Sequence, residues 1–333
     1  MKNIIGRKKL WLAGLVLIGL VVVLLGWICW GKRPLLSPKG EGDFNVYSTW
    51  YQYRFDELGR REFEEGEISL GEVQSQSRYG EVRKFYFTVS GKKVSGLAHI
   101  PLGKGFFPAV LMVRGYAERQ GYYSGSGTDK VAEKLVEKGI LTLAPDFLGY
   151  GESEAESEDM LEARFAKAET VLALLYSLKS LEMVDLDRVG LWGHSNGGQI
   201  ILSVLEISGL RLPTVLWAPV SKGFPEGVLV YADDLDDGGE AVRGAIEEFE
   251  KREDTRFFSI DYWWERVRAA VLVLQGTADK WVETEWSEEL VKNLQETGGE
   301  ARLVKYEGAD HNLKQNWSEA VEETLEFYER EKI

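Results

Sequence analysis

The stretch GLWGHSNGG places Ser195 inside the pattern G-x-S-x-G. This pattern is typical of a sharp strand-to-helix turn, where the two backbones nearly touch and glycine fits two residues before and after the serine. Gly193 and Gly197 hold those positions. Residues 187–192 form a short apolar run typical of a strand, and residues 199–207 can only be a buried helix or strand. These segments predict a strand, a turn and a helix in that order, with Ser195 at the turn as a nucleophile. The alternative is that Ser195 lies in a glycine-rich bend and has no chemical role.

A nucleophilic serine needs a base that takes its proton. The chain offers three histidines. His194 adjoins the serine and would point away from it on such a turn, and His99 lies within a strand-like run, where we expect it to be packed. His311, in EGADHNL, lies between a strand-like run and the last helix-like run. Because α/β folds hold functional groups on loops at the carboxyl ends of strands, His311 is the predicted base.

The base in turn needs an acid that orients it. Asp279, in LQGTADKWV, follows a buried strand-like run and is the predicted orienter. Asp310 is a rival, although neighbouring loop residues rarely bond side chain to side chain in the geometry required. The alternative for Asp279 is a turn residue that merely ends a strand.

Elements of two kinds surround these residues. Three strand-like runs separated by turns come first, and alternating buried strands and helices follow from Pro108 onward. This order predicts one large α/β domain with a mostly parallel sheet and antiparallel N-terminal strands. The runs are strands at 67–76, 81–89, 92–100, 108–113, 140–145, 187–192, 214–219, 269–276 and 300–306, and helices at 128–139, 164–180, 284–299 and 317–330.

One region interrupts this alternation. Pro225–Asp254 holds 11 acidic residues against three basic ones, between two buried strand-like runs. It is either a solvated surface excursion or part of a lid over the site, spanning about 220–258. The aromatic run that follows, RFFSIDYWWERV, could line a pocket or pack as a helix on the sheet.

From about Tyr53 to the C-terminus, the chain resembles the α/β-hydrolase superfamily, in its prolyl-oligopeptidase-like and dienelactone-hydrolase-like branch. The motifs that carry the resemblance are VSGLAHIPLGKGFFPAVLMVRGY, GTDKVAEKLVEKGILTLAPDFLGYGES, LWGHSNGG, VLVLQGTADKWV and YEGADHNL. The resemblance implies the chain order of nucleophile Ser195, orienter Asp279 and base His311.

The same resemblance implies an oxyanion hole formed by the backbone N–H groups of Asn196 and Tyr116. The chain departs from the family at this loop, because Arg114-Gly115 stands where the family usually has His-Gly. Since the donors are backbone groups, the substitution need not abolish the hole. The resemblance implies no cofactor and no metal.

The N-terminal part of the chain is of a different kind. Residues 10–31 contain no charge and, as a helix, would span a bilayer of about 30 Å. We expect an uncleaved membrane anchor, with a cleaved signal peptide and a lipid-modified Cys29 as alternatives. Four basic residues before Leu10 against two after residue 31 favour an extracytoplasmic catalytic domain. The predicted organisation is a basic segment 1–9, an anchor 10–31, a linker 32–52 and a catalytic domain 53–333.

Composition narrows the function further. The net charge of −14 argues against a nucleic-acid partner, and the single cysteine excludes an internal disulfide and a cysteine-based metal site. The sequence therefore predicts a membrane-anchored serine hydrolase that cleaves an amide (peptide) or ester bond of a small-molecule or peptide substrate through an acyl-enzyme. The alternatives are a carboxylesterase of small acyl esters and a non-catalytic binding protein of the same fold.

Overall fold

The structure is a computed structural model that describes residues 48–63 and 66–333. The predicted basic segment 1–9 and membrane anchor 10–31 lie outside these residues, as does the predicted linker up to residue 47. Within the described part of the chain, no helix has both the length and the apolar character needed to cross a bilayer.

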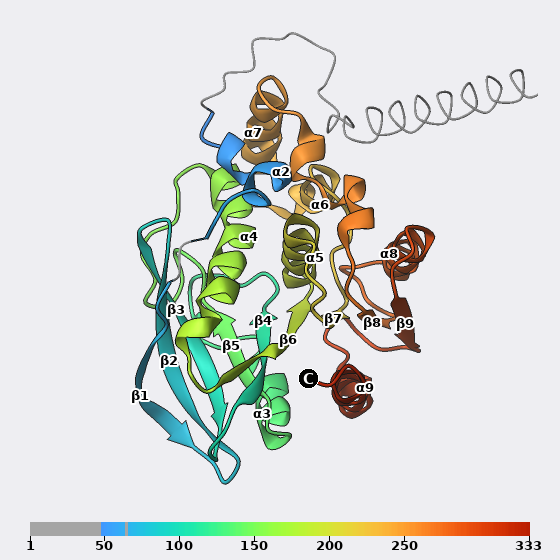
Figure 1. The fold of residues 1–333 in the computed structure, drawn as a ribbon. Coiled ribbons are helices and arrows are strands. Elements are labelled where there is room, and N and C mark those ends of the chain that lie inside the picture. Colours follow the sequence, from blue (N-terminus) through green and yellow to red (C-terminus); the bar gives the residue numbers. More distant parts are fainter. Residues whose placement is uncertain (1–47, 64–65) are drawn as a thin grey trace, which may run out of the picture. The chain divides into compact units, whose positions relative to one another are not determined.

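A twisted sheet of nine strands forms the centre of the described chain (Figure 1). The strand order is β1-β2-β3-β5-β4-β6-β7-β8-β9. In this order, the neighbouring strands from β1 to β5 pair antiparallel. The remaining pairs, from β5–β4 to β8–β9, are parallel. The predicted fold class, a mostly parallel sheet with antiparallel N-terminal strands, is confirmed. The strands are β1 (Ser69–Gln76), β2 (Gly80–Val89), β3 (Lys92–Pro101), β4 (Phe107–Val113), β5 (Leu141–Pro145), β6 (Val184–His194), β7 (Thr214–Trp217), β8 (Val271–Gly276) and β9 (Ala301–Tyr306).

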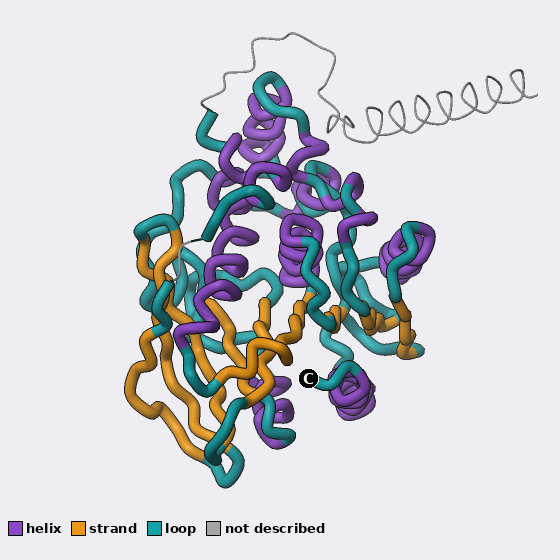
Figure 2. Tube along the Cα trace, in the orientation of Figure 1, coloured by secondary structure: helices purple, strands orange, loops and turns teal. Residues whose placement is uncertain are grey.

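Helices cover both faces of this sheet (Figures 1 and 2). One face is packed by α3 and α9, and the other by α4, α5 and α8. The continuous apolar runs predicted as buried strands are explained by this arrangement, because both faces of the central strands are covered. The α-helices of the described residues are α2 (Phe55–Leu58), α3 (Asp129–Glu137), α4 (Met160–Ser177), α5 (Asn196–Ser208), α6 (Glu226–Leu229), α7 (Glu240–Glu250), α8 (Thr284–Glu296) and α9 (Trp317–Arg330).

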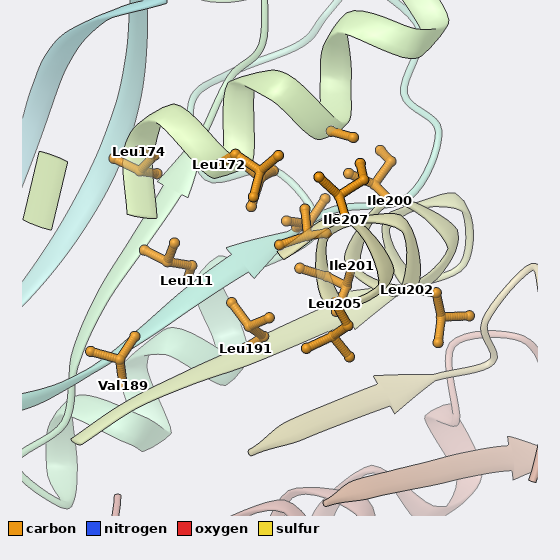
Figure 3. Close-up of a cluster of buried hydrophobic side chains, with 14 of the residues drawn as sticks. Leu111, Leu172, Leu174, Val189, Leu191, Ile200, Ile201, Leu202, Leu205 and Ile207 are labelled. Atoms are coloured by element: carbon orange, nitrogen blue, oxygen red, sulfur yellow. The ribbon is translucent and has the colours of Figure 1, made fainter. Parts of the chain in front are cut away.

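The segment 199–207, which the sequence left open between helix and strand, lies in α5. Leu111 of β4 and Leu191 of β6 pack against α5, and Leu172 of α4 closes the cluster from the side (Figure 3). A helix enclosed in this way is apolar around most of its circumference, so its sequence shows no polar stripe. The helix ends before Gly209, which has a left-handed backbone conformation.

The acidic region 225–254, here called the cap, is packed rather than loosely solvated. Val242, Ile246 and Phe249 form the buried face of its helix α7. The ring of Phe249 lies 5.0 Å from that of Trp50 and 5.2 Å from that of Phe224, measured between centroids. The cap is therefore held by an aromatic cluster that joins it to the segment before α2 and to the loop after β7.

Candidate active site

Ser195 lies at the turn between β6 and α5, as the pattern G-x-S-x-G predicts. Its φ of +55° and ψ of −124° are a strained combination for a residue with a side chain. The backbone around it is fixed by hydrogen bonds: its N–H donates to the carbonyl of Trp217 at 2.9 Å, and its carbonyl accepts from Gly198 and Val220. These hydrogen bonds hold Ser195 in its strained backbone conformation.

Three glycines allow the turn to close. A Cβ on Gly193 would lie 2.8 Å from the carbonyl oxygen of Gly197, and one on Gly197 would overlap the carbonyl oxygen of Val113. On the facing loop, a Cβ on Gly115 would lie 2.9 Å from the Cβ of Ser195. Glycine at these positions is therefore a steric requirement of the close approach between β4, β6 and α5.

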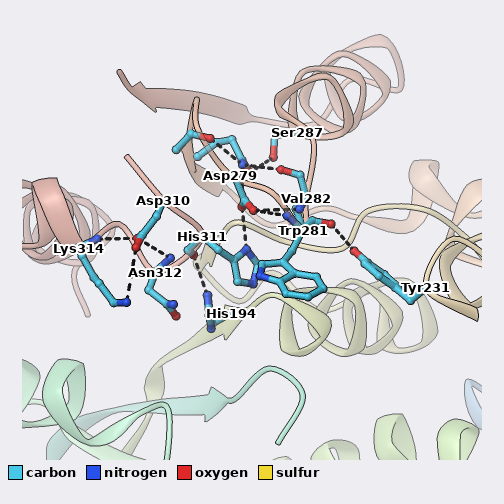
Figure 4. Close-up of polar contacts among 12 residues, drawn as sticks. His194, Tyr231, Asp279, Trp281, Val282, Ser287, Asp310, His311, Asn312 and Lys314 are labelled. Atoms are coloured by element: carbon cyan, nitrogen blue, oxygen red, sulfur yellow. Dashed lines mark hydrogen bonds and ion pairs between the residues drawn. The ribbon is translucent and has the colours of Figure 1, made fainter. Parts of the chain in front are cut away.

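Asp279 and His311 meet close to His194, the residue before Ser195 (Figure 4). The Nδ1 of His311 lies 2.7 Å from the Oδ2 of Asp279, and the side chains are 14% and 0% exposed. Burial raises the pKa of Asp279, whereas hydrogen bonds from His311 and from the N–H groups of Trp281 and Val282 lower it, and the net pKa is below the usual range. The structure thus brings together the predicted base and orienter, although no hydrogen bond between Ser195 and the His311 ring occurs among the described contacts.

The rival acid has a different role. Asp310 accepts hydrogen bonds from the backbone N–H groups of Asn312 and Lys314, both at 3.0 Å, and forms an ion pair with the Lys314 side chain. These contacts shape the loop that carries His311.

The other two histidines are also engaged elsewhere. His99 is buried in β3, and burial lowers its pKa to about 4. The Nε2 of His194 lies 3.1 Å from the carbonyl oxygen of His311, and the two rings are 4.8 Å apart. Burial and the charge of His311 lower the pKa of His194 to about 4, so its neutral ring donates this hydrogen bond near pH 7. His194, the last residue of β6, therefore ties the His311 loop to the strand that precedes Ser195.

The residues that support Asp279 were not among those predicted from the sequence. Gln275 is fully buried, and its amide donates to the carbonyl of Val282 and to Oδ2 of Asp279 at 3.2 Å. Its oxygen accepts a hydrogen bond from Ser287 of α8. A glutamine at the end of an apolar strand is the one signal that could have suggested such a role.

The predicted oxyanion-hole donors lie on the two segments that face each other here. Asn196 is the first residue of α5, where backbone N–H groups lack partners within the helix. Tyr116 follows Gly115 on the loop after β4, and its side chain is 80% exposed.

Arg114 is buried and takes the place of the family's histidine on this loop. Its guanidinium donates to the carbonyls of Gly115 and Asp146 and lies over the rings of Tyr122 and Tyr150, at 4.7 and 4.3 Å from their centroids. These contacts hold the loop that carries Tyr116.

A hollow lies between α4 and α5 and reaches Asn196, the residue that follows Ser195. Its wall includes Asn196 and Gln199 of α5, Arg164 and Lys167 of α4, and Phe224 from the loop before the cap. Within residues 48–63 and 66–333, no cluster of histidine, cysteine or acidic side chains is suited to hold a metal ion.

A short stretch of the chain is similar in sequence to a known bacterial protein. The quorum-quenching protein AidA of Acinetobacter baumannii is 28% identical over 93 residues, which are 28% of this chain and 30% of that protein. The match thus spans less than a third of that relative's length.

Solved structures show the same fold at low sequence identity. Acetyl xylan esterase 1 from Thermoanaerobacterium superposes with a TM-score of 0.58 and 20% identity, over 82% of this chain and 93% of that one. The acylaminoacyl peptidase of Pyrococcus horikoshii also gives a TM-score of 0.58, with 19% identity, over 76% of this chain and 42% of that one.

The sequence model of the prolyl oligopeptidase family matches residues 128–332. This stretch runs from the start of α3 to the end of α9 and includes the Ser195 turn and the loops of Asp279 and His311. Because the match covers more than half of the chain, this protein belongs to the prolyl oligopeptidase family and is a serine hydrolase of the α/β-hydrolase fold.

Proposed function

We propose that Ser195, His311 and Asp279 form a catalytic triad that hydrolyses a carboxylic ester or amide through an acyl-enzyme. The observation that carries the proposal is the 2.7 Å contact between His311 Nδ1 and Asp279 Oδ2 beside the strained Ser195 turn. The charged carboxylate of Asp279 accepts the Nδ1–H proton, which leaves Nε2 of His311 as the acceptor that a serine hydroxyl requires.

The reaction then proceeds in two halves. His311 takes the proton from Oγ of Ser195 as that oxygen attacks the substrate carbonyl, and the N–H groups of Asn196 and Tyr116 stabilise the resulting oxyanion. His311 returns the proton to the leaving alcohol or amine, which leaves an acyl group on Ser195. A water molecule, activated by His311, releases the acid and restores the serine.

The bond that is cleaved has two candidates. Cleavage of an amide (peptide) bond is supported by the match to the prolyl oligopeptidase family. Cleavage of an ester is supported by the fraction of each structural neighbour that superposes on this chain. That fraction is 93% for an acetyl xylan esterase but 42% for an acylaminoacyl peptidase. We expect purified full-length protein in detergent to turn over short acyl esters or aminoacyl amides, with Ser195→Ala as the control. If kcat/KM is measurable for esters alone, the protein is a carboxylesterase. If it also hydrolyses amides, the protein is a peptidase.

We further propose that residues 10–31 anchor the protein in a membrane, with the catalytic domain on the extracytoplasmic side. The support for this proposal is the uncharged 22-residue stretch and the larger number of basic residues on its N-terminal side.

A further inference from the structure

Two cationic side chains line the hollow between α4 and α5. Arg164 and Lys167 lie one turn apart on α4 and share the wall of the hollow with Asn196 and Gln199 of α5. Figure 1 shows α4 and α5 running side by side above the sheet. Lys167 also lines a second hollow of about 220 Å³, which extends along α4 to Gln52 and Glu156.

Neither cation has a carboxylate partner among the described residues. Arg164 donates to the side-chain oxygen of Gln199, a neutral acceptor. For Lys167, the contacts of the described chain include no hydrogen bond and no ion pair. Glu156, whose charge acts to raise the pKa of Lys167, is itself paired with Arg119.

The carboxylates along the second hollow are engaged as well. Glu169 forms an ion pair with Arg61 and accepts a hydrogen bond from Ser90. Glu162 accepts hydrogen bonds from Tyr53 and Ser157. The first hollow, between α4 and α5, has no acidic residue in its wall, so Arg164 and Lys167 face it without a carboxylate partner among the described residues.

This arrangement is unfavourable without a ligand. Burial, and to a smaller extent the charges of Arg164 and Arg114, lower the pKa of Lys167 to about 8. Burial also lowers the pKa of Arg164 to about 10. Both residues are partly buried. A cation that is partly removed from water is destabilised unless an anion or several hydrogen bonds compensate it, and perturbed groups of this kind in a cleft are typical of binding sites.

The acidic surface of the cap does not supply the missing charge. Its carboxylates at Asp233, Asp234, Asp236 and Asp237 are exposed, and neither hollow is lined by a residue of the range 225–254. The chain thus has a negative exterior, with a net charge of −14, and a positive hollow between α4 and α5.

We propose that Arg164 and Lys167 bind a carboxylate of the substrate, so that this enzyme prefers esters or amides whose acyl or leaving group carries a negative charge. The inference rests on the proposed function, because it assigns the hollow to the substrate of Ser195. A carboxylate between a guanidinium and an ammonium would form charge-assisted hydrogen bonds with both and would restore the electrostatic balance of the hollow.

Two pairs of esters test this inference and separate the two ends of the substrate. The acyl arm compares mono(para-nitrophenyl) adipate with the uncharged para-nitrophenyl adipamate. The leaving-group arm compares meta-acetoxybenzoate with meta-acetoxybenzamide. We expect kcat/KM for the anion to exceed that for its neutral counterpart by about 10-fold or more in one arm, as is typical of a hydrogen bond to a charged group.

Variants of the full-length protein locate the effect. Lys167→Met should lower the ratio of kcat/KM for the preferred anion to kcat/KM for its neutral counterpart about 10-fold, mainly through the KM of the anion. Lys167→Arg should retain most of the preference, and Arg164→Gln should lower it as Lys167→Met does. Lys134→Met is the matched control, because Lys134 lies on α3, on the opposite face of the sheet, and should leave both rates unchanged.

The outcomes are distinguishable. Equal rates for anion and neutral ester in both arms, or an equal loss of both rates in Lys167→Met, would overturn the inference. If a fluorophosphonate still labels Ser195 in that case, the proposed function stands. If no ester is turned over and Ser195 is not labelled, the proposed function fails and the inference fails with it.

Discussion

The carboxylate of Asp279 shows how one residue is prepared for its proposed task. Oδ1 accepts the N–H groups of Trp281 and Val282 at 2.8 and 3.0 Å, while Oδ2 faces His311 and Gln275. These donors outweigh the effect of burial on the pKa of Asp279, so the group stays charged at neutral pH and can stabilise a protonated His311.

Two aspartate variants test this role at the residue scale. Asp279→Asn should lower kcat by about 10⁴-fold, because an amide that donates to Nδ1 would favour the wrong tautomer of His311. Asp310→Asn should have an effect of less than about 10-fold, since its contacts are to the loop backbone. Steady-state kinetics on one ester measure kcat for both variants. If Asp310→Asn causes the large loss and Asp279→Asn the small one, Asp279 is not the residue that orients His311.

At the scale of elements, the turn between β6 and α5 depends on glycine. Gly197→Ala should lower the free energy of unfolding by about 3 kcal/mol, because its Cβ would overlap backbone that cannot move. Gly244→Ala in α7 is the matched control: nothing lies within 4 Å of the added Cβ, and alanine should stabilise that helix by about 0.5–1 kcal/mol. Urea denaturation measures both, and similar small changes would contradict the close approach.

Helix α5 also carries a buried acid, Glu206, whose carboxylate oxygens have no hydrogen-bond partner among the described residues. Burial, and then the charges of Asp261 and Glu265, raise the pKa of Glu206 well above its usual value. The folded state therefore holds this proton more tightly than the unfolded state. The contribution of this proton to the free energy of unfolding is complete below the pKa that Glu206 has in the unfolded state. It is lost as pH rises toward the pKa that Glu206 has in the folded state.

Glu206→Gln removes this titration while preserving the shape of the side chain. The variant should be more stable than the wild type at pH 8, by about 1–3 kcal/mol, and the gain should shrink toward pH 5. Unfolding by urea at both pH values measures the difference. A gain that is equal at the two pH values would mean that Glu206 does not titrate as described.

Much of the element order could be predicted because the parallel strands are apolar on both faces and the outer helices have one apolar side. The predicted strand at 269–276 and the predicted helix at 317–330, for example, correspond to β8 and α9. The inward direction of Arg164 and Lys167 could not be predicted. Because α4 packs against α5, the cap cluster and the sheet at once, its sequence has no single polar face that would reveal which cations point inside.

For the whole molecule, the segment before α2 contributes more than a linker sequence indicates. The Nε1 of Trp50 donates to Asp159, the residue that caps α4, and the Trp50 ring packs on Phe249 of the cap. A tryptophan next to a Pro- and Gly-bearing stretch has no periodic pattern around it, so only the tertiary structure identifies its partners.

The proposed anchor is tested on the intact chain. If residues 10–31 span a membrane, high salt should not release the protein, because hydrophobic insertion is not screened by ions. Protease added to spheroplasts should digest the catalytic domain, as the basic residues before Leu10 favour an extracytoplasmic position. Release by salt would refute the anchor, and protection until lysis would reverse the orientation.

The central claim, that Ser195 is a nucleophile activated by His311, is tested most directly by covalent labelling with a fluorophosphonate. The probe should modify the wild-type protein at Ser195, Ser195→Ala should abolish modification, and His311→Ala should slow it by about 10³-fold or more. Intact-protein mass spectrometry followed by peptide mapping measures the site and the rate. Labelling of Ser195 at the wild-type rate in His311→Ala, or labelling that persists in Ser195→Ala, would contradict the account.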